Sequence, residues 1–362
     1  MPVPRTMRAV VLTGHGGFER LEYRADVPVP VPAPDEVLVR IAAAGVNNTD
    51  INTRSGWYSR TVTEGTTTAG AAGGYGASAR EDSGWTGGGF AFPRIQGADA
   101  CGEIVATGSG VAASRVGERV LVEPVFRAPG GGAADAVYFG SERDGAFAEY
   151  AAVPAVYAYP IESPCSDAEL ASFPCAYSAA ENMLTRAALR AGETVLVTGA
   201  SGGVGSAAVQ LAHRRGAQVI AVASDAKAAV VASLGAARVV PRGADLVAAV
   251  GKESVHVTID VVGGLRFGQL LAVLRRGGRY AVAGAIGGPI VELDLRTLYL
   301  KDLRLLGCTV LEPEVFRNLV GYIERGEIRP VVSATYPLAA IVAAQQDFLA
   351  KQHTGKIVLL VR

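Results

Sequence analysis

A glycine-rich turn between an apolar strand and an amphipathic helix constrains this chain more than any other feature. The stretch "VLVTGASGGVGSAAVQLA" runs from Val195 to Ala212. Glycines in such a turn let the backbone approach a phosphate chain and let the helix pack closely on the strand, and the first N–H groups of the helix attract anions. We therefore predict a dinucleotide site in the turn, formed by Gly199, Ala200, Ser201, Gly202, Gly203, Val204 and Gly205.

The pattern around this turn predicts an α/β chain of two domains. Residues 1–160 read as short β-branched strands broken by Gly and Pro, which indicates a β-rich domain. In residues 161–302 strands alternate with helices, which predicts a doubly wound parallel sheet, the Rossmann arrangement. Residues 303–362 are expected to return to the first domain.

The end of the strand after the glycine turn indicates which dinucleotide binds. NAD-binding chains usually place an acid there to bind the ribose hydroxyls. In "VIAVASDAKAA" the strand ends before Ser224 and Lys227, which can bind and neutralise a 2′-phosphate, and Arg242 follows the next strand. Asp225 leaves NADH open, and Lys227 could simply begin a solvated helix face. We expect NADPH, with NADH as the less favoured cofactor.

Composition excludes several classes of partner. The 34 basic and 34 acidic residues balance, which argues against nucleic acid or an anionic membrane as the main partner. No apolar run approaches the ~20 residues of a membrane span, and the N-terminal stretch lacks the apolar core of a signal peptide. The four cysteines lie far apart without a CxxC pair. The expected setting is therefore cytoplasmic, with a small-molecule partner.

Residues 60–92 form a segment of different character. This stretch is rich in Gly, Ser and Thr and carries Tyr75, Trp85 and Phe90. A surface insertion and a lid over a binding site are both compatible with this composition, because long loops in compact domains are often functional.

Several motifs together resemble the medium-chain dehydrogenase/reductase superfamily. They are "GERVLVEP", "GAFAEYAAVPA", "GETVLVTGASGGVG", "IDVVGG" and "GKIVLLVR", in this order along the chain. Within the superfamily the chain looks most like the zinc-independent quinone oxidoreductase and enoyl reductase branch. The resemblance implies a GroES-like catalytic domain, a Rossmann domain, an active site in the cleft between them, and a homo-oligomer (dimer or tetramer).

The resemblance also allows a test for the catalytic zinc that alcohol dehydrogenases of this family hold. Their first cysteine ligand corresponds to Asn47, and their histidine corresponds to Ala98 in the turn "GAD". Only the second cysteine has a counterpart, Cys175, for which a small buried residue is the simpler reading. One thiol with an amide and Asp99 is a poor set of zinc ligands, so we expect no metal.

A metal-free site favours electron-poor acceptors. Quinones and α,β-unsaturated carbonyls accept hydride with the charge delocalised onto oxygen, which hydrogen-bond donors can stabilise. The amide of Asn47 is one such donor. By resemblance, Tyr58 is the leading general acid or substrate anchor and Thr49 stands at the proton-relay position, although Tyr58 could only pack in a lid and Asp50 could only cap a turn.

The remaining cofactor contacts are implied by resemblance alone. Val262 and Gly263, with Gly284 and Ala285, match strand ends that flank the nicotinamide, and Lys356 matches a lysine often close to the cofactor phosphates. Ser178 lies near the nicotinamide or ribose position, but the threonine usual at the next position is Ala179 here.

The sequence thus predicts an NADPH-dependent, zinc-independent oxidoreductase that transfers hydride to a quinone or an α,β-unsaturated carbonyl. A zinc-type alcohol or aldehyde dehydrogenase is the first alternative. A nucleotide-binding protein with little turnover is the second.

Overall fold

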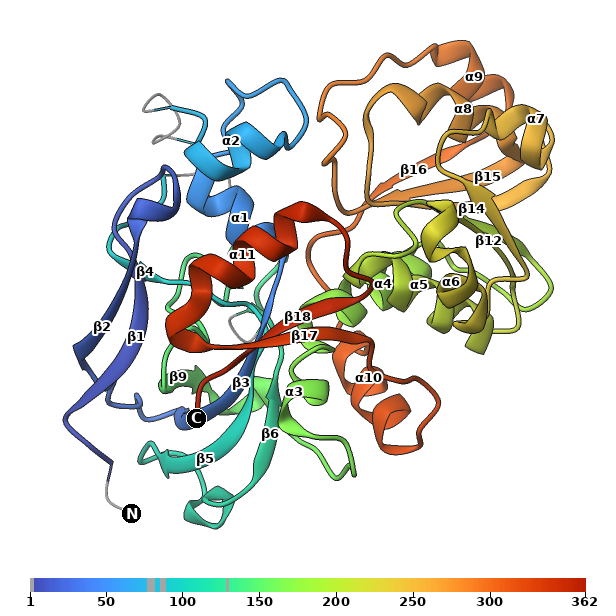
Figure 1. The fold of residues 1–362 in the computed structure, drawn as a ribbon. Coiled ribbons are helices and arrows are strands. Elements are labelled where there is room, and N and C mark those ends of the chain that lie inside the picture. Colours follow the sequence, from blue (N-terminus) through green and yellow to red (C-terminus); the bar gives the residue numbers. More distant parts are fainter. Residues whose placement is uncertain (1–2, 77–81, 85–88, 128–129) are drawn as a thin grey trace. The chain divides into compact units, whose positions relative to one another are not determined.

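The structure, a computed structural model, describes residues 3–76, 82–84, 89–127 and 130–362, and its contacts divide the chain into two units (Figure 1). The first unit comprises Met1–Val62, Thr67–Cys175 and Pro330–Arg362, and the second comprises Thr63–Thr66 and Ala176–Arg329. The expected boundaries were 160 and 302. The chain instead enters the second unit after Cys175 and returns after Arg329.

The first unit is built on antiparallel strand pairs, with one parallel pair between β17 and β18. Its largest sheet has the order β10-β6-β5-β3-β18-β17, with β9 also paired to β3, and a smaller sheet has the order β2-β1-β4. The strands of the two sheets are β1 (Thr6–Leu12), β2 (Leu21–Pro28), β3 (Glu36–Val46), β4 (Arg94–Ile95), β5 (Cys101–Thr107), β6 (Arg119–Val122), β9 (Tyr150–Pro154), β10 (Ala158–Pro160), β17 (Val332–Pro337) and β18 (Lys356–Leu360). A separate pair joins β7 (Val125–Phe126) to β8 (Val137–Tyr138).

Strand β3 is the centre of this unit because nearly every one of its residues is buried. It pairs antiparallel with β5, with β9 and with the C-terminal strand β18, so that Ile357 lies opposite Val46. The apolar core beneath it includes residues from both ends of the chain. The α-helices that the described residues of this unit form are α1 (Asn48–Ser55), α2 (Thr68–Gly73), α3 (Asp167–Leu170) and α11 (Ile341–Ala350).

The second unit is a six-stranded, wholly parallel sheet in the order β13-β12-β11-β14-β15-β16. This confirms the doubly wound arrangement that the alternating pattern predicted. The strands are β11 (Thr194–Val197), β12 (Gln218–Ala223), β13 (Arg238–Pro241), β14 (Val255–Asp260), β15 (Leu274–Val282) and β16 (Arg304–Gly307). The helices are α4 (Pro174–Arg186), α5 (Gly203–Arg214), α6 (Ala228–Ser233), α7 (Leu246–Val250), α8 (Phe267–Val273), α9 (Leu295–Leu300) and α10 (Val315–Glu324).

The unit boundaries follow from where helices bury their apolar faces. Helix α10 buries Phe316 and Leu319, and it belongs to the second unit rather than to the returning segment. Two separate helices, α3 and α4, lie at the junction of the two units. Ser166 and Glu169 form a capping box that starts α3, and Pro174 begins α4.

Within the described part of the 60–92 segment, Thr63–Thr66 belong to the second unit, and residues from Thr67 onward belong to the first. Helix α2 starts at Thr67, whose Oγ1 accepts a hydrogen bond from the Gly70 N–H. Arg54, at 0% exposure, donates hydrogen bonds to Ala71 O of α2 (2.6 Å), to Gly16 O (2.8 Å) and to Gln345 Oε1 of α11 (3.0 Å). Trp85 lies outside the described residues. Residues 67–74 are therefore held by a buried cation.

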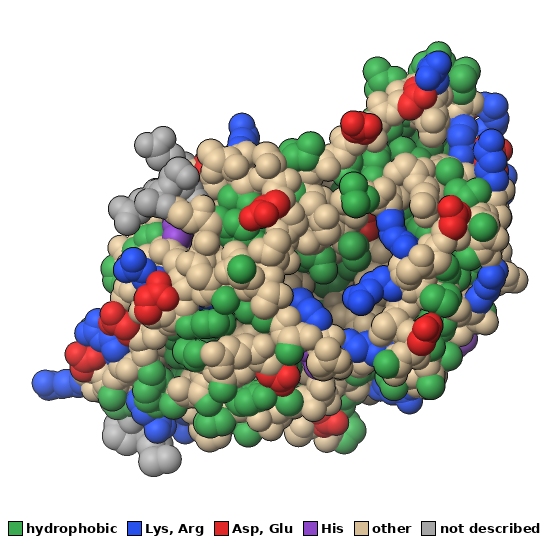
Figure 2. Space-filling view, turned by 45° about the horizontal axis from the view of Figure 1, so that its top comes forward, with side chains coloured by type: hydrophobic (Ala, Val, Ile, Leu, Met, Phe, Trp, Pro, Cys, Tyr) green, Lys and Arg blue, Asp and Glu red, His purple; other side chains and the backbone are tan. Residues whose placement is uncertain are grey.

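Among the described residues, no helix is long and apolar enough to cross a membrane. Figure 2 shows acidic side chains distributed among the basic ones on the face in view.

Candidate functional site

The glycine turn lies between β11 and α5, at the carboxyl end of the central strand of the parallel sheet. Gly199 has φ +56°, and a Cβ on Gly205 would lie 2.1 Å from Gly199 O. Both positions therefore require glycine. The first N–H groups of α5 lie at this turn, which is the context that a pyrophosphate site needs. Binding by Gly199–Gly205 stays a prediction.

Two cations lie at the ends of the next strands, β12 and β13. Lys227 follows Ser224 by one turn, with its N–H bonded to Ser224 O (3.0 Å), and the Arg242 N–H donates to Ala223 O (2.8 Å). Partial burial and the charge of the nearby Arg242 guanidinium lower the pKa of Lys227. Two cations close enough to repel each other favour binding of an anion with more than one negative charge.

The loops after β14 and β15 pack against each other. The Gly287 N–H donates to Val262 O (2.7 Å), and a Cβ on Gly263 would lie 3.2 Å from the Cα of Ala285. A Cβ on Gly284 would lie 3.0 Å from Val261 O. Val262, Gly263, Gly284 and Ala285 are therefore brought together, as a shared site requires. Ser178 is buried in α4 of the same unit.

In the first unit, Asn47 stands immediately before α1, at the end of β3. Its N–H donates to Asp50 Oδ2 (2.8 Å), so Asp50 caps the first turn of the helix. The simple reading of Asp50 as a capping residue is thereby confirmed. At Gly45, two residues earlier, a Cβ would lie 2.4 Å from Asp99 Oδ2, so the carboxylate approaches the backbone of β3 closely.

A buried lysine binds both Asn47 and Asp99. The Lys356 ammonium, with its side chain 3% exposed, donates to Asp99 Oδ2 (2.7 Å), Asn47 Oδ1 (2.5 Å) and Val46 O (3.1 Å). Asn47 Nδ2 in turn donates to Asp99 Oδ2 (2.8 Å) and Gly45 O (3.3 Å). Both ends of the amide are therefore engaged. The expected contact of Lys356 with cofactor phosphates stays a prediction.

In the cluster formed by Asn47, Asp50, Asp99 and Lys356, the pKa of Asp50 is shifted, as is the pKa of the adjacent Cys175 thiol. Burial raises the pKa of Asp50 to about 7, against the opposing effects of the Asn47 N–H and the Lys356 charge. Burial, reinforced by the Asp99 carboxylate, raises the pKa of the Cys175 thiol well above its usual range. The Cys175 N–H donates to Asp99 Oδ1 (2.5 Å). The lysine therefore neutralises a carboxylate that already accepts several N–H groups.

The other expected catalytic residues lie at opposite ends of α1. Thr49 is half-buried in the first turn, whereas Tyr58 follows the helix end at Gly56. An eight-residue helix is about 12 Å long. The Tyr58 ring packs edge-on against Trp57, with a centroid separation of 5.6 Å. Thr49 thus lies next to Asn47, and Tyr58 lies beyond the far end of the helix.

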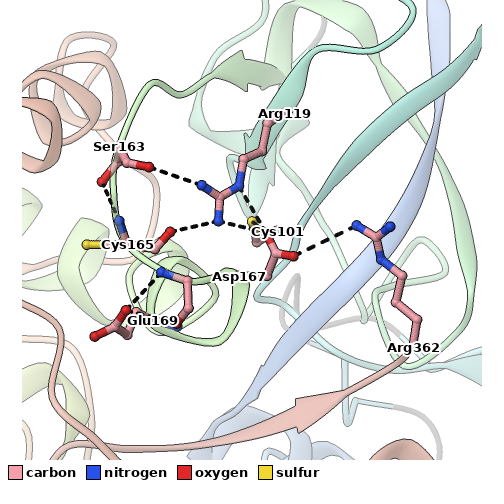
Figure 3. Close-up of polar contacts among 8 residues, drawn as sticks. Cys101, Arg119, Ser163, Cys165, Asp167, Glu169 and Arg362 are labelled. Carbon is pink, nitrogen blue, oxygen red and sulfur yellow. Dashed lines mark hydrogen bonds and ion pairs between the residues drawn. The ribbon is translucent and has the colours of Figure 1, made fainter.

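A second charged cluster fixes the segment that leads to Cys175 (Figure 3). Asp167, the first residue of α3, accepts from Arg119 Nε (2.9 Å) and from Cys101 Sγ (3.6 Å). Arg119 also donates to Ser163 O (3.2 Å) and Cys165 O (2.8 Å). Burial, with a smaller effect of Asp167, raises the pKa of Cys101 to about 12. Residues 163–167 are therefore anchored to β5 and β6.

Family models match both parts of the chain. A model of the alcohol dehydrogenase GroES-like domain matches residues 33–163, and a model of zinc-binding dehydrogenases matches residues 203–325. A quinone oxidoreductase of Lama guanicoe is 30% identical over 99% of this chain and 98% of its own length. The chain belongs to the medium-chain dehydrogenase/reductase superfamily.

Two further comparisons place this dehydrogenase/reductase among its relatives. An acryloyl-coenzyme A reductase of Metallosphaera sedula is 30% identical over 98% of this chain and 99% of its own length. A solved Sinorhizobium meliloti protein, described as a candidate alcohol dehydrogenase, is 49% identical with a TM-score of 0.87, covering 99% of this chain and 97% of that one. The chain is an NAD(P)-dependent oxidoreductase with a GroES-like and a Rossmann-type domain, as the resemblance implied.

Sequence reasoning missed the partnership of Lys356 with Asn47 and Asp99, and it missed Asp260 and Thr198 beneath the glycine turn. Lys356 is separated from Asn47 by 309 positions, and the resemblance assigned it to the cofactor phosphates instead. Asp260 carried one available signal, because an acid that ends an otherwise apolar strand in "VTIDVVGG" must find several donors.

Proposed function

We propose that this dehydrogenase/reductase is an NADPH-dependent, zinc-independent enzyme that transfers hydride to a quinone or an α,β-unsaturated carbonyl. The observation that carries the proposal is the Lys356 ammonium, which lies between Asn47 Oδ1 and Asp99 Oδ2. In this family the corresponding turns supply zinc ligands in alcohol dehydrogenases, and in this chain their oxygen atoms bind a lysine.

The side chains at the positions of the zinc ligands support a zinc-independent site. Zinc sites use three or four converging thiolate, imidazole or carboxylate ligands. Here Ala98 has no donor atom, the Asn47 oxygen accepts from Lys356, and Asp99 accepts from Lys356, Asn47 and the Cys175 N–H. Cys175 remains as a single thiol. These residues do not fit a tetrahedral zinc ion, and the positive charge comes from the lysine.

Electron-poor acceptors suit such a site. Two relatives are named for substrates that are conjugated carbonyl compounds: a quinone oxidoreductase and an acryloyl-coenzyme A reductase. Such compounds accept hydride at carbon while negative charge develops on oxygen, which hydroxyl or amide donors can stabilise. Because both ends of the Asn47 amide are engaged, a substrate oxygen would compete with Asp99 for it. Thr49 and Tyr58 therefore become the preferred donors, and Asn47 holds the ammonium in place.

The cations after β12 and β13 support NADPH. Replacing Lys227 or Arg242 by alanine is expected to raise KM for NADPH roughly 10- to 100-fold, because one charge-assisted hydrogen bond contributes about 1.5–3 kcal/mol. KM for NADH should change less than about twofold, since NADH lacks the 2′-phosphate. Steady-state kinetics with both cofactors measure this.

The matched control is Arg276→Ala, which removes an exposed arginine paired with Asp302 in the same unit. It should leave both KM values unchanged. Equal losses for NADPH and NADH in the Lys227 and Arg242 variants would contradict a 2′-phosphate pocket.

The reaction is tested with chelator-treated protein, NADPH, and a panel of quinones, 2-enals, 2-enones and simple aldehydes. We expect turnover with quinones or activated alkenes. We also expect less than about 0.1 zinc per chain by elemental analysis, because Lys356 neutralises Asp99 and few side chains at the site can coordinate zinc. Activity restricted to simple aldehydes and restored by added zinc would overturn the proposal.

A zinc-type alcohol dehydrogenase is the second candidate, because the 49% identical structure is described as a candidate alcohol dehydrogenase. Bound zinc and oxidation of simple alcohols would favour it. A nucleotide-binding protein with little turnover would bind NADPH without oxidising it in the presence of any acceptor. The expected homo-oligomer, dimer or tetramer, also stays a prediction.

A further inference from the structure

The order of strands in the second unit places its ligand crevice at one point. Strand β11 is followed along the chain by β12 and β13 on one side, and β14, β15 and β16 lie on its other side. The connections therefore reverse direction between β11 and β14. In open parallel sheets, ligands bind outside the carboxyl ends of the strands at such a reversal. The glycine turn after β11 forms one side of this crevice.

Asp260 ends β14 directly beneath the reversal. It is 0% exposed and accepts hydrogen bonds through both carboxylate oxygens. Thr198 Oγ1 donates to Oδ1 (2.5 Å), Tyr280 Oη donates to Oδ2 (2.6 Å), and the Val262 N–H donates to Oδ1 (2.9 Å). The Gly263 N–H lies 3.2 Å from both oxygens. Every contact is made by a donor, so the group acts as an acceptor on all sides.

The partners of Asp260 come from three neighbouring strands. Thr198 follows β11 and stands immediately before the glycine turn, and its Oγ1 also accepts from the Val261 N–H (3.1 Å). Tyr280 lies on β15, where burial and then the Asp260 charge raise the pKa of its hydroxyl. Val262 and Gly263 lie in the loop after β14. Asp260 thus joins the loop after β14 to the start of the glycine turn and to β15.

The loop that Asp260 holds then positions the next one. Val262 O accepts from the Gly287 N–H (2.7 Å), and a Cβ on Gly263 would lie 3.0 Å from Gly288 O. These contacts are tight, so a shift of the 261–264 loop would move residues 285–288. The backbone around the crevice therefore depends on one buried carboxylate.

We infer that Asp260 is a positioning residue for the dinucleotide, acting through Thr198 on the glycine turn and through the Val262 and Gly263 N–H groups on the facing loop. The inference rests on the proposed cofactor site and concerns binding alone, so it does not depend on the acceptor. Asp260 does not contact the cofactor itself; it fixes the backbone that does.

The experiment measures NADPH dissociation constants by ligand fluorescence in the absence of acceptor, together with the midpoint of thermal unfolding. Asp260→Asn keeps the shape of the side chain and loses one acceptor oxygen, and Thr198→Val removes the link to β11. We expect the dissociation constant to rise roughly tenfold or more in each, because small displacements of binding groups have large effects. Val257→Ala, which shortens a buried side chain of β14, is the matched control and should leave the dissociation constant within about twofold at a similar loss of thermal stability.

An unchanged dissociation constant in folded Asp260→Asn and Thr198→Val would overturn the inference, as would an equal rise in Val257→Ala. If Asp260→Asn fails to fold, Thr198→Val and Tyr280→Phe carry the test. Wild-type protein that binds NADPH tightly yet reduces no acceptor would refute the proposed reaction while leaving this measurement intact.

Discussion

Replacing Lys356 by methionine is expected to lower the free energy of unfolding of the first unit by roughly 3–5 kcal/mol, the usual effect of removing one partner from a buried ion pair. Methionine retains much of the side-chain volume but leaves the Asp99 carboxylate without its cation. It also leaves Asn47 Oδ1 and Val46 O without this donor. Urea unfolding followed by tryptophan fluorescence measures the change, since Trp57 is buried in the first unit.

A double variant separates the charge from the packing. In Lys356→Met/Asp99→Asn no carboxylate is left at this position, while an amide oxygen can still accept from the Cys175 N–H. We expect it to recover about 1–3 kcal/mol relative to Lys356→Met alone, because an uncompensated buried charge is the larger penalty. Equal stability of the single and double variants would mean that the ion pair does not hold this cluster together.

Replacing Arg54 by methionine is expected to lower the free energy of unfolding of the same unit by roughly 3 kcal/mol or more. The guanidinium is fully buried, and burial lowers its pKa to about 10. It binds Ala71 O, Gly16 O and Gln345 Oε1, and it lies 4.5 Å above the Phe18 ring. Methionine would leave these three oxygens without this donor.

The same change should release α2, which can be measured independently by limited proteolysis in residues 60–76. Arg24→Met is the control, because Arg24 forms an exposed pair with Asp26 and such pairs contribute about 0–1 kcal/mol. Cleavage at the wild-type rate in Arg54→Met would show that α2 is held by other contacts.

Local sequence patterns predicted the fold class well, because turns, strands and helices depend mainly on residues close together in the sequence. The glycine turn and the alternation of strands and helices predicted the parallel sheet, and Asp50 caps α1, which was one of the readings left open for it. The division of the units was placed differently, since it depends on which unit buries α3 and α10, a question of tertiary contacts.

The site was predicted less fully for a physical reason. Asn47 was treated as a donor for a substrate oxygen, whereas both ends of its amide bind buried groups far away in the sequence. A hydrogen bond between residues 47 and 356 leaves no local periodicity to read. The residues expected to bind the cofactor follow strands of one parallel sheet, whose carboxyl ends share one edge, and their binding stays a prediction.

The position of β18 determines the order in which the two units can fold during synthesis at the ribosome. Strand β3 ends at Val46, yet its neighbour β18 begins at Lys356, so the whole second unit is synthesised between the two strands. The parallel sheet of the second unit lies wholly within residues 194–307 and can close first. Until β18 has been synthesised, the β18-facing edge of β3 stays unpaired, and an open strand edge invites aggregation. A truncated or stalled chain would therefore present one finished domain attached to one that cannot close.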